Sequence, residues 1–384
     1  MLATLATHRL RRAVVAGAGA LLLSLLAVGC SSDRPKPSPL LDYVPRADAR
    51  QVWQAKLDSV KFPMVISARG GVFVVAGTDG TVLSLDAATG RELWRTSAGA
   101  ELTAGVGSDG RFQSVVTRDN ILVTFENGKE IWRQRLSARV STAPLVGGER
   151  VFVMGVDRAI AAFDALDGTR LWSLQRPGDA LTLLNTGVLT GVKDTLVAGQ
   201  GPRMIGVDPN LGTLRWEIAL ASPRGVNEVE RLADLVGPSV RFGTTVCARS
   251  YQAGVGCADA ALGKVLWARP AGGINAVGGN SERIYGADAV DRIVAWRADN
   301  GETVWSSEKL QYRGLSAPAS VGKTVAFGDL EGIVHFLDPD SGETLLRLAT
   351  DGSPVVGAPA VLDDTLLVVT RNGGLFAFRG GRTN

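Results

Sequence analysis

The stretch from Val72 to Trp94 reads VFVVAGTDGTVLSLDAATGRELW and contains three short strands of one β-unit. Its apolar runs VFVVA and TVLSL are separated by Asp79-Gly80, a dipeptide that tolerates the positive φ angles of a tight hairpin turn. A second turn, DAATG, ends at Gly90 and is followed by a third short run that closes on Trp94. The stretch therefore predicts a β-hairpin followed by a third strand.

The same unit recurs along the chain, each time with a glycine four residues before a tryptophan. The six pairs are Gly90/Trp94, Gly128/Trp132, Gly168/Trp172, Gly212/Trp216, Gly263/Trp267 and Gly301/Trp305. A seventh copy, LDPDSGETLL, has Leu346 in place of the tryptophan, and successive positions of this series are 38 to 51 residues apart. This period is close to the roughly 40 to 45 residues of one four-stranded propeller blade.

An eighth copy, residues 365–378, has only its first two strands and the Asn372-Gly373 turn. The strand ARQVWQAKL at residues 49–57, which carries Trp53, belongs to no other copy. We therefore predict an all-β fold, an eight-bladed β-propeller of four-stranded blades whose last blade is closed by the N-terminal strand. The alternative is an open stack of β-units, which would leave an apolar edge at each end.

The first 29 residues have the pattern of a lipoprotein signal peptide. Three arginines, the last of them Arg12, precede an uncharged apolar run from Ala13 to Val28 that is short for a membrane span. Small residues then lead directly into Cys30, so this cysteine is expected to become the acylated first residue of the mature chain. An ordinary signal peptide followed by an incidental cysteine is the alternative.

By analogy with lipoprotein sorting, Ser31 after the cysteine implies an outer-membrane lipoprotein that faces the periplasm. Residues 30–45 comprise the lipidated cysteine and a polar, proline-rich run, SSDRPKPSPLL, which is typical of a semi-extended, flexible tether. Residues 46–384 are predicted to form the propeller.

The formal net charge of +3 comes from the leader. Without residues 1–29 the chain has 38 basic and 38 acidic residues, so the mature protein carries no net charge. A nucleic-acid footprint requires clustered Lys and Arg on a net basic domain, and none is visible. The sequence therefore predicts no nucleic-acid partner.

Signatures of catalysis are also missing from the sequence. It contains no CxxC, HExxH, GxSxG or P-loop motif, so no catalytic residue, metal site or cofactor is predicted. The repeated aspartates occupy one turn position ahead of glycine, and we expect them to accept backbone N–H groups rather than to act as paired acids. They are Asp86, Asp164, Asp208, Asp259 and Asp338.

Cys247 and Cys257 lie on the two apolar runs of the fifth hairpin, equidistant from Gln252 at its tip. Cross-strand partners can approach closely enough for a disulfide, which would persist in an exported protein. We predict this disulfide; the alternative is a pair of buried thiols that pack as small hydrophobic groups. The one histidine after the leader, His335, lies in the strand IVHFL and is expected to be a packed side chain.

The AxxGxxxW units resemble the quinoprotein-type propeller repeat, and the lipoprotein-like leader with eight units is similar to the BamB family of outer-membrane assembly lipoproteins. More specific is NEVERLADLVGPSV, residues 227–240, which resembles an interblade loop of that family. The resemblance implies a non-catalytic scaffold that binds the periplasmic part of BamA, the barrel that inserts outer-membrane proteins. It also implies contact with other assembly-machinery subunits and a role in delivering unfolded outer-membrane protein clients; whether these clients contact the propeller directly stays open on sequence grounds.

In the family, this loop and a neighbouring leucine-rich loop bind BamA; here the second loop is LTLLN, residues 181–185. By this resemblance, the residues expected to bind BamA are Leu181, Leu183, Arg231 and Asp234. Two positions depart from the family pattern, because Leu184 replaces an arginine and Val236 replaces a second aspartate.

The repeat spacing points to the same loops. The two longest intervals between tryptophans, 44 and 51 residues, are consecutive, and the additional residues lie mainly after Trp172 and after Trp216. Both are connections from a last strand to the next blade, so we expect them side by side on one face, the usual position of a binding surface. Lengthening of the loops without a function is the alternative.

Two other function classes remain open on sequence grounds. A quinone-dependent periplasmic dehydrogenase should, by resemblance, carry adjacent cysteines and a calcium site, whereas Cys247 and Cys257 are ten residues apart. A propeller that senses a ligand in its central channel has no signature that the sequence could reveal.

Overall fold

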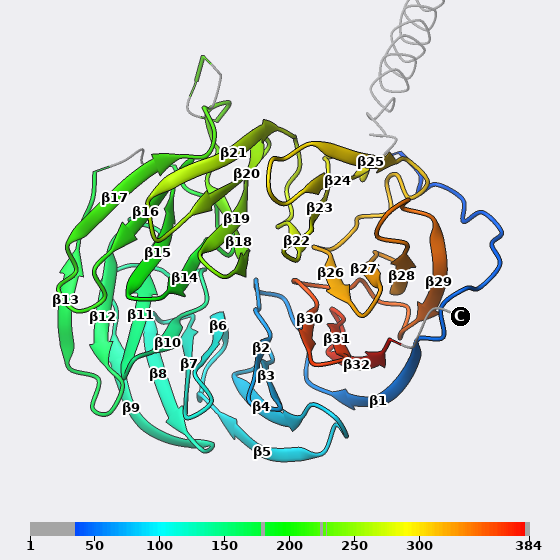
Figure 1. Ribbon diagram of the computed structural model, residues 1–384. Helices are drawn as coiled ribbons and strands as arrows, with labels where there is room; N and C mark the ends of the chain where they lie inside the picture. Colours follow the sequence, from blue (N-terminus) through cyan, green and yellow to red (C-terminus); the bar gives the residue numbers. More distant parts are fainter. Residues whose placement is uncertain (1–34, 178–180, 223–225, 228, 381–384) are drawn as a thin grey trace, which may run out of the picture. The chain divides into compact units, whose positions relative to one another are not determined.

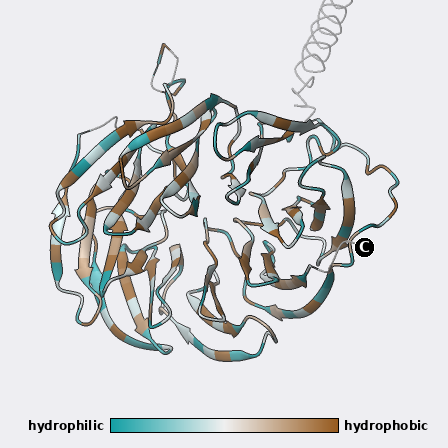
Figure 2. Cartoon of the chain, in the orientation of Figure 1, coloured by the Kyte–Doolittle hydropathy of each residue, from teal (hydrophilic) through white to brown (hydrophobic). Residues whose placement is uncertain are grey.

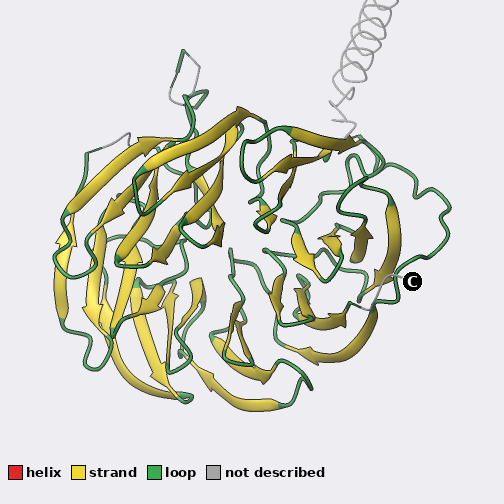
Figure 3. Ribbon diagram, in the orientation of Figure 1, coloured by secondary structure: helices red, strands yellow, loops and turns green. Residues whose placement is uncertain are grey.

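The computed structural model describes residues 35–177, 181–222, 226–227 and 229–380. The chain divides into a short N-terminal unit and a compact unit from Pro37 to Asn384. Cys30 and the first part of the predicted tether lie outside the described residues. Within the described ranges all regular secondary structure is β, arranged as eight four-stranded sheets in a ring (Figures 1 and 3). The predicted eight-bladed propeller is confirmed.

Each blade is an antiparallel sheet whose first strand lies nearest the axis of the ring and whose fourth lies outermost. Blades one to four comprise β2 (Ser67–Arg69), β3 (Val72–Ala76), β4 (Thr81–Asp86) and β5 (Glu92–Ser97); β6 (Leu102–Ser108), β7 (Phe112–Thr117), β8 (Ile121–Glu126) and β9 (Lys129–Arg135); β10 (Leu145–Gly147), β11 (Arg150–Met154), β12 (Ile160–Asp164) and β13 (Arg170–Leu174); and β14 (Leu189–Val192), β15 (Thr195–Gln200), β16 (Arg203–Val207) and β17 (Leu214–Ala219). Blades five to eight comprise β18 (Leu235–Phe242), β19 (Thr245–Ser250), β20 (Gly254–Asp259) and β21 (Lys264–Pro270); β22 (Gly278–Gly279), β23 (Arg283–Ala287), β24 (Ile293–Arg297) and β25 (Thr303–Ser307); β26 (Ala319–Val321), β27 (Thr324–Gly328), β28 (Ile333–Leu337) and β29 (Thr344–Ala349); and β30 (Ala360–Leu362), β31 (Thr365–Val369), β32 (Gly374–Arg379) and β1 (Arg50–Lys56).

The ring is closed in the predicted manner, because the N-terminal strand β1 is the outer strand of the last blade. It pairs antiparallel with β32 from Arg50 opposite Arg379 to Lys56 opposite Gly374. The inner strands β30 and β2 of the eighth and first blades are also in contact. Backbone hydrogen bonds therefore join the two ends of the propeller, which closes the ring without an apolar edge at either end.

The hydrophobic core lies between neighbouring blades rather than in one central cluster. Middle strands such as β4 are buried on both faces, whereas the outer strand β5 alternates between exposed and half-buried residues, as Figure 2 illustrates by hydropathy. One cluster joins Phe73 and Leu83 of the first blade to Leu367 and Leu375 of the eighth. Each blade is therefore stabilised mainly by its two neighbours.

The repeated glycine and tryptophan form a contact between successive blades. Gly90 has a φ of 71°, and a Cβ atom there would lie 2.5 Å from the ring of Trp53, which belongs to the preceding blade. The indole N–H of Trp53 donates to the carbonyl of Ala87 in the same turn at 3.0 Å. The same bond recurs for Trp132, Trp172, Trp267 and Trp305. The glycine is required because a side chain would displace the neighbouring indole.

The turn aspartates have the expected Asx role. Asp86 Oδ1 accepts the N–H of Thr89 at 2.9 Å, and hydrogen bonds from Thr89 lower the pKa of this carboxyl group. Equivalent bonds are made by Asp164, Asp208, Asp259 and Asp338. These carboxylates therefore belong to the repeated turn, each in its own blade.

Cys247 on β19 lies directly opposite Cys257 on β20, and their sulfur atoms are bonded. The two Cα atoms are 4.0 Å apart, and both residues are fully buried. The disulfide therefore lies inside the fifth blade, between the two middle strands.

Part of the predicted tether is bound to the propeller. Ser38 N–H donates to the carbonyl of Gln311 at 2.9 Å, and its own carbonyl accepts Arg313 Nη1 at 3.0 Å. Further along, the Tyr43 hydroxyl accepts the N–H of Arg347 at 2.9 Å, and the guanidinium of Arg347 lies over the Tyr43 ring. Ser38 is therefore held at the connection between β25 and β26, and residues 41–46 are held along β29 of the seventh blade.

Candidate functional site

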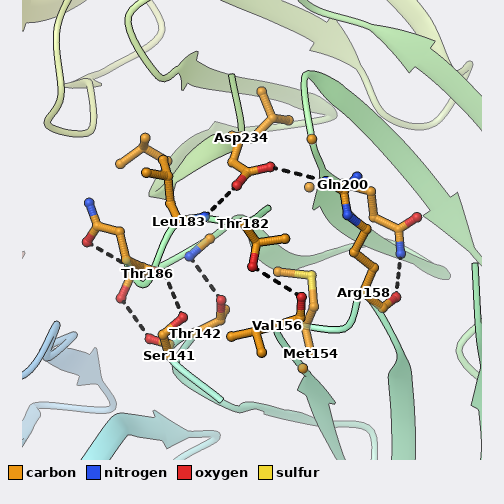
Figure 4. A pocket seen from close by; sticks show the side chains of 17 residues that line it. Ser141, Thr142, Met154, Val156, Arg158, Thr182, Leu183, Thr186, Gln200 and Asp234 are labelled. Atoms are coloured by element: carbon orange, nitrogen blue, oxygen red, sulfur yellow. Dashed lines mark hydrogen bonds and ion pairs between the residues drawn. The ribbon is translucent and has the colours of Figure 1, made fainter. Parts of the chain in front are cut away.

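The two enlarged connections have a common position in the ring. The 3–4 loop (residues 175–188) joins β13 to β14, and the 4–5 loop (residues 220–234) joins β17 to β18. Each runs from an outer strand to the inner strand of the next blade, so both emerge on the same face. The backbone N–H of Leu183 donates to Asp234 Oδ2 at 2.7 Å, which joins the two loops directly (Figure 4).

The second half of the 3–4 loop is held by hydrogen bonds from distant parts of the chain. Thr186 Oγ1 donates to the carbonyl of Pro63, in the connection between β1 and β2, at 3.0 Å. Ser141 Oγ donates to the carbonyl of Asn185 at 2.9 Å, and Thr142 Oγ1 accepts the N–H of Gly187 at 3.0 Å. Residues 185–187 therefore have a defined course on this face.

Leu183 is a half-buried anchor rather than an exposed side chain. It packs against an apolar cluster of Val236, Ala276 and Ala317, together with Tyr251 and Ala358. These residues lie in or close to the ends of inner and middle strands of blades five to eight, around the axis of the ring. Val236, one of the two departures from the family pattern, is 2% exposed and so belongs to this packing.

The exposed side chains of this surface are two other leucines, Leu181 and Leu184, and Arg231. Leu181 is 38% exposed and Leu184 is 57% exposed. Arg231 is exposed on the 4–5 loop, in a turn where Asn227 Oδ1 accepts the N–H of Glu230 at 2.9 Å. The structure therefore brings Leu183 and Asp234 into contact and leaves Leu181, Leu184 and Arg231 accessible.

Asp234 is mostly buried and connects three elements. Besides the bond from Leu183, its Oδ1 lies 3.8 Å from Nη2 of Arg158, and its backbone carbonyl accepts the N–H of Tyr251 at 2.9 Å. Only 17% of the Asp234 side chain and 14% of the Arg158 side chain are exposed. The Asp234 carboxylate therefore holds the two loops together in addition to contributing a negative charge.

Arg158 is the member of this site that the sequence analysis missed. It lies in the turn between β11 and β12 with a φ of 67°, at the position that Gly80 occupies in the first blade. A long side chain at a turn position that favours glycine is a signal that could have drawn attention to it. At position 184, where the family pattern has an arginine, this chain has leucine, and the guanidinium that pairs with Asp234 comes from the third blade.

A small cavity lies beneath the joined loops. It has a volume of about 50 Å³ and is lined by residues that include Arg158, Thr182, Leu183 and Asp234 (Figure 4). This is room for a few water molecules at most, not for a cofactor. A wider hollow of about 600 Å³ flanks the 4–5 loop and is lined by residues that include Tyr251.

The histidine in the described part of the chain has a structural partner. His335 Nε2 and Asp329 Oδ2 are 2.9 Å apart in the core of the seventh blade, where burial lowers the pKa of the imidazole. No group of three or more His, Cys, Asp or Glu side chains that could hold a metal ion occurs among the described residues. The same residues include no helix that is long and apolar enough to cross a membrane.

Comparison with known proteins decides the family. The chain matches the family model described as outer membrane protein assembly factor BamB over residues 78–307 and 301–382. It is 36% identical to the outer membrane protein assembly factor BamB of Bordetella pertussis over 372 residues, which cover 94% of this chain and 96% of that protein. The chain belongs to the BamB family. The crystal structure of BamB from Moraxella catarrhalis has a TM-score of 0.78 at 22% identity and covers 86% of this chain and 100% of that one.

The BamB fold is shared with enzymes. The structure of quinohemoprotein alcohol dehydrogenase from Comamonas testosteroni matches with a TM-score of 0.66 at 15% identity and covers 91% of this chain and 81% of that one. A likeness at this level of identity concerns the propeller architecture alone. The family is therefore decided by the sequence relatives, which are BamB assembly factors.

Proposed function

We propose that this chain is a non-catalytic scaffold of outer-membrane protein assembly that binds BamA through the 3–4 and 4–5 loops. Membership of the BamB family supports the assembly role, since its relatives carry the name of outer membrane protein assembly factors. The observation that carries the choice of surface is the Leu183–Asp234 hydrogen bond, which makes one continuous surface from the two enlarged loops. The quinone-dependent dehydrogenase alternative is set aside, because the relatives that define the family are assembly factors.

The accessible side chains of this surface suit a small protein interface. Leu181 and Leu184 supply apolar contact area, and Val229 on the 4–5 loop is 70% exposed. Arg231 supplies an accessible charged group nearby, and the mostly buried carboxylate of Asp234 lies beneath the surface. Apolar anchors that exclude water, with a few charged groups that fix orientation, are the usual anatomy of a binding hot spot.

The second part of the proposal concerns location. Acylated Cys30 anchors the protein to the outer membrane, with the propeller in the periplasm. Two acyl chains, at about 0.8 kcal/mol per buried CH₂, hold a protein far more firmly than one. We expect intact-mass measurement of the mature protein to show the lipid, and we expect Cys30→Ala to release a soluble or unprocessed form; a wild-type mass without lipid would contradict this part.

Co-purification from detergent-solubilised membranes tests the partner. Leu181→Glu should reduce the recovery of BamA, because it places a charge where an apolar contact is expected. Leu211→Glu is the matched control, since Leu211 is 69% exposed in the turn between β16 and β17, on the opposite face. If Leu211→Glu abolished recovery while Leu181→Glu left it unchanged, the proposed surface would be on the wrong side of the ring.

A further inference from the structure

Two charged side chains, Arg158 and Asp234, line the cavity beneath the joined loops. The backbone of Arg158 is held in place, since its carbonyl accepts Nε2 of Gln200, the last residue of β15, at 2.9 Å. The turn of the third blade is therefore fixed against the fourth blade. From this position the Arg158 guanidinium extends to the carboxylate of Asp234 in the 4–5 loop.

The two oxygens of Asp234 have different partners. Oδ1 faces Arg158 Nη2 at 3.8 Å, and Oδ2 accepts the N–H of Leu183 at 2.7 Å. Both charged side chains are largely shielded from water, where the attraction between opposite charges is stronger than on an open surface. Because the carboxylate is planar and rigid, attraction of Oδ1 by Arg158 also fixes the direction in which Oδ2 points.

We infer that Arg158 is a positioning residue of the partner surface: it orients the Asp234 carboxylate so that this group ties the 3–4 loop to the 4–5 loop. The inference rests on the proposed function of these loops and adds a residue from the third blade to it. Arg158 acts through Asp234 and does not itself supply contact area. Without Arg158, the hydrogen bond from the Leu183 N–H to Asp234 is weaker, and the positions of Leu181 and Leu184 are less well defined.

The experiment compares Arg158→Ala and Arg158→Lys in the full mature protein. Arg215→Ala is the matched control, because Arg215 forms ion pairs with Asp194 and Asp208 on the opposite face of the fourth blade. Hydrogen exchange of peptides that contain Leu183 reports the loop bond, and the affinity for purified BamA reports the partner surface.

We expect Arg158→Ala to exchange faster at the Leu183 peptide and to bind BamA about fivefold more weakly, which corresponds to about 1 kcal/mol. Arg158→Lys keeps the charge and should lie closer to the wild type on both measurements. Arg215→Ala should match the wild type on both. Thermal melting should remain a single transition in all three variants, because the residues lie outside the interblade cores. Only Arg158→Ala should melt slightly earlier, since it leaves the shielded Asp234 carboxylate less well compensated.

The two measurements separate failure of this inference from failure of the proposed function. Unchanged exchange at the Leu183 peptide in Arg158→Ala would overturn the inference, whatever BamA does. Faster exchange with unchanged BamA affinity would overturn the role of Arg158 in the partner surface. If the wild type itself did not bind BamA while Arg158→Ala still exchanged faster and Arg158→Lys recovered, the proposed partner would fail and the positioning role would stand.

Discussion

Two tryptophans at equivalent repeat positions should respond differently to replacement by phenylalanine. Trp267 is 6% exposed, and its indole N–H donates to the carbonyl of Ala298 at 2.9 Å. The indole nitrogen of Trp216 is buried and has no hydrogen-bond partner among the described residues. Both substitutions shrink the ring, but only Trp267→Phe removes a hydrogen bond between blades.

The loss of unfolding free energy in each variant depends on whether the substitution leaves a polar group without a hydrogen-bond partner. Trp267→Phe leaves the Ala298 carbonyl without its donor, which costs about 1 to 2 kcal/mol beyond the loss of ring area. Trp216→Phe removes an N–H whose burial without a partner already costs a similar amount, so this gain offsets much of the lost packing. The expected difference between the two variants is therefore about 2 to 4 kcal/mol in the free energy of unfolding.

Urea titration of both variants, followed by circular dichroism, measures this difference, and their denaturant slopes should agree if the comparison is valid. Gly301→Ala, which places a methyl group against the Trp267 ring, is the corresponding change on the other side of the contact. It should destabilise the protein as Trp267→Phe does. Equal losses for Trp267→Phe and Trp216→Phe would refute the argument that the indole N–H joins the blades.

Three further outcomes are expected. Reduction of Cys247–Cys257 should lower the free energy of unfolding by about 2 to 3 kcal/mol, given the short loop that the bond closes, without opening the ring; free alkylation of both thiols in unreduced, denatured protein would contradict the bond. Leu183→Glu should abolish BamA co-purification and Asp234→Ala should weaken it, the first by placing a charge in the apolar cluster and the second by freeing the 3–4 loop. Because burial lowers the pKa of His335 below its ordinary 6.5, the unfolded chain binds the extra proton first, so the melting temperature should fall as the pH drops from 7 to 5, and less so in His335→Gln.

The architecture could be predicted from the sequence because its determinants are local and repeated. The Asp79-Gly80 turn and the aspartate of the next turn each act within a few residues of the chain. Eight copies of such a unit leave few ways to bury the apolar middle strands, and β1 supplied the missing strand of the last blade. Even so, the reason for the glycine lay outside its own unit, in the indole of the preceding blade.

The sequence predicted that the two enlarged loops lie side by side on one face of the ring, but not the contacts that join them. Loop length and the family resemblance led to Leu183 and Asp234, and the structure joins them by a hydrogen bond. The other contacts join residues far apart in the sequence: Arg158 lies 76 residues before Asp234, and Thr186 bonds to Pro63 in the connection between β1 and β2. Contacts of this kind depend on where blades three, four and five meet, which no periodic pattern encodes.

The same limit explains why the exposure of the leucines could not be read from the 3–4 loop. LTLLN has no hydrophobic period, so the sequence does not distinguish a leucine that packs on the propeller from one that faces a partner. The distinction comes from Val236, Ala276 and Ala317, which form an apolar seat for Leu183. Because this packing holds the Leu183 side chain and Asp234 holds its N–H, we expect residues 181–184 to be ordered before the proposed partner binds. A loop ordered in advance loses less conformational entropy on binding, which raises affinity without any new contact.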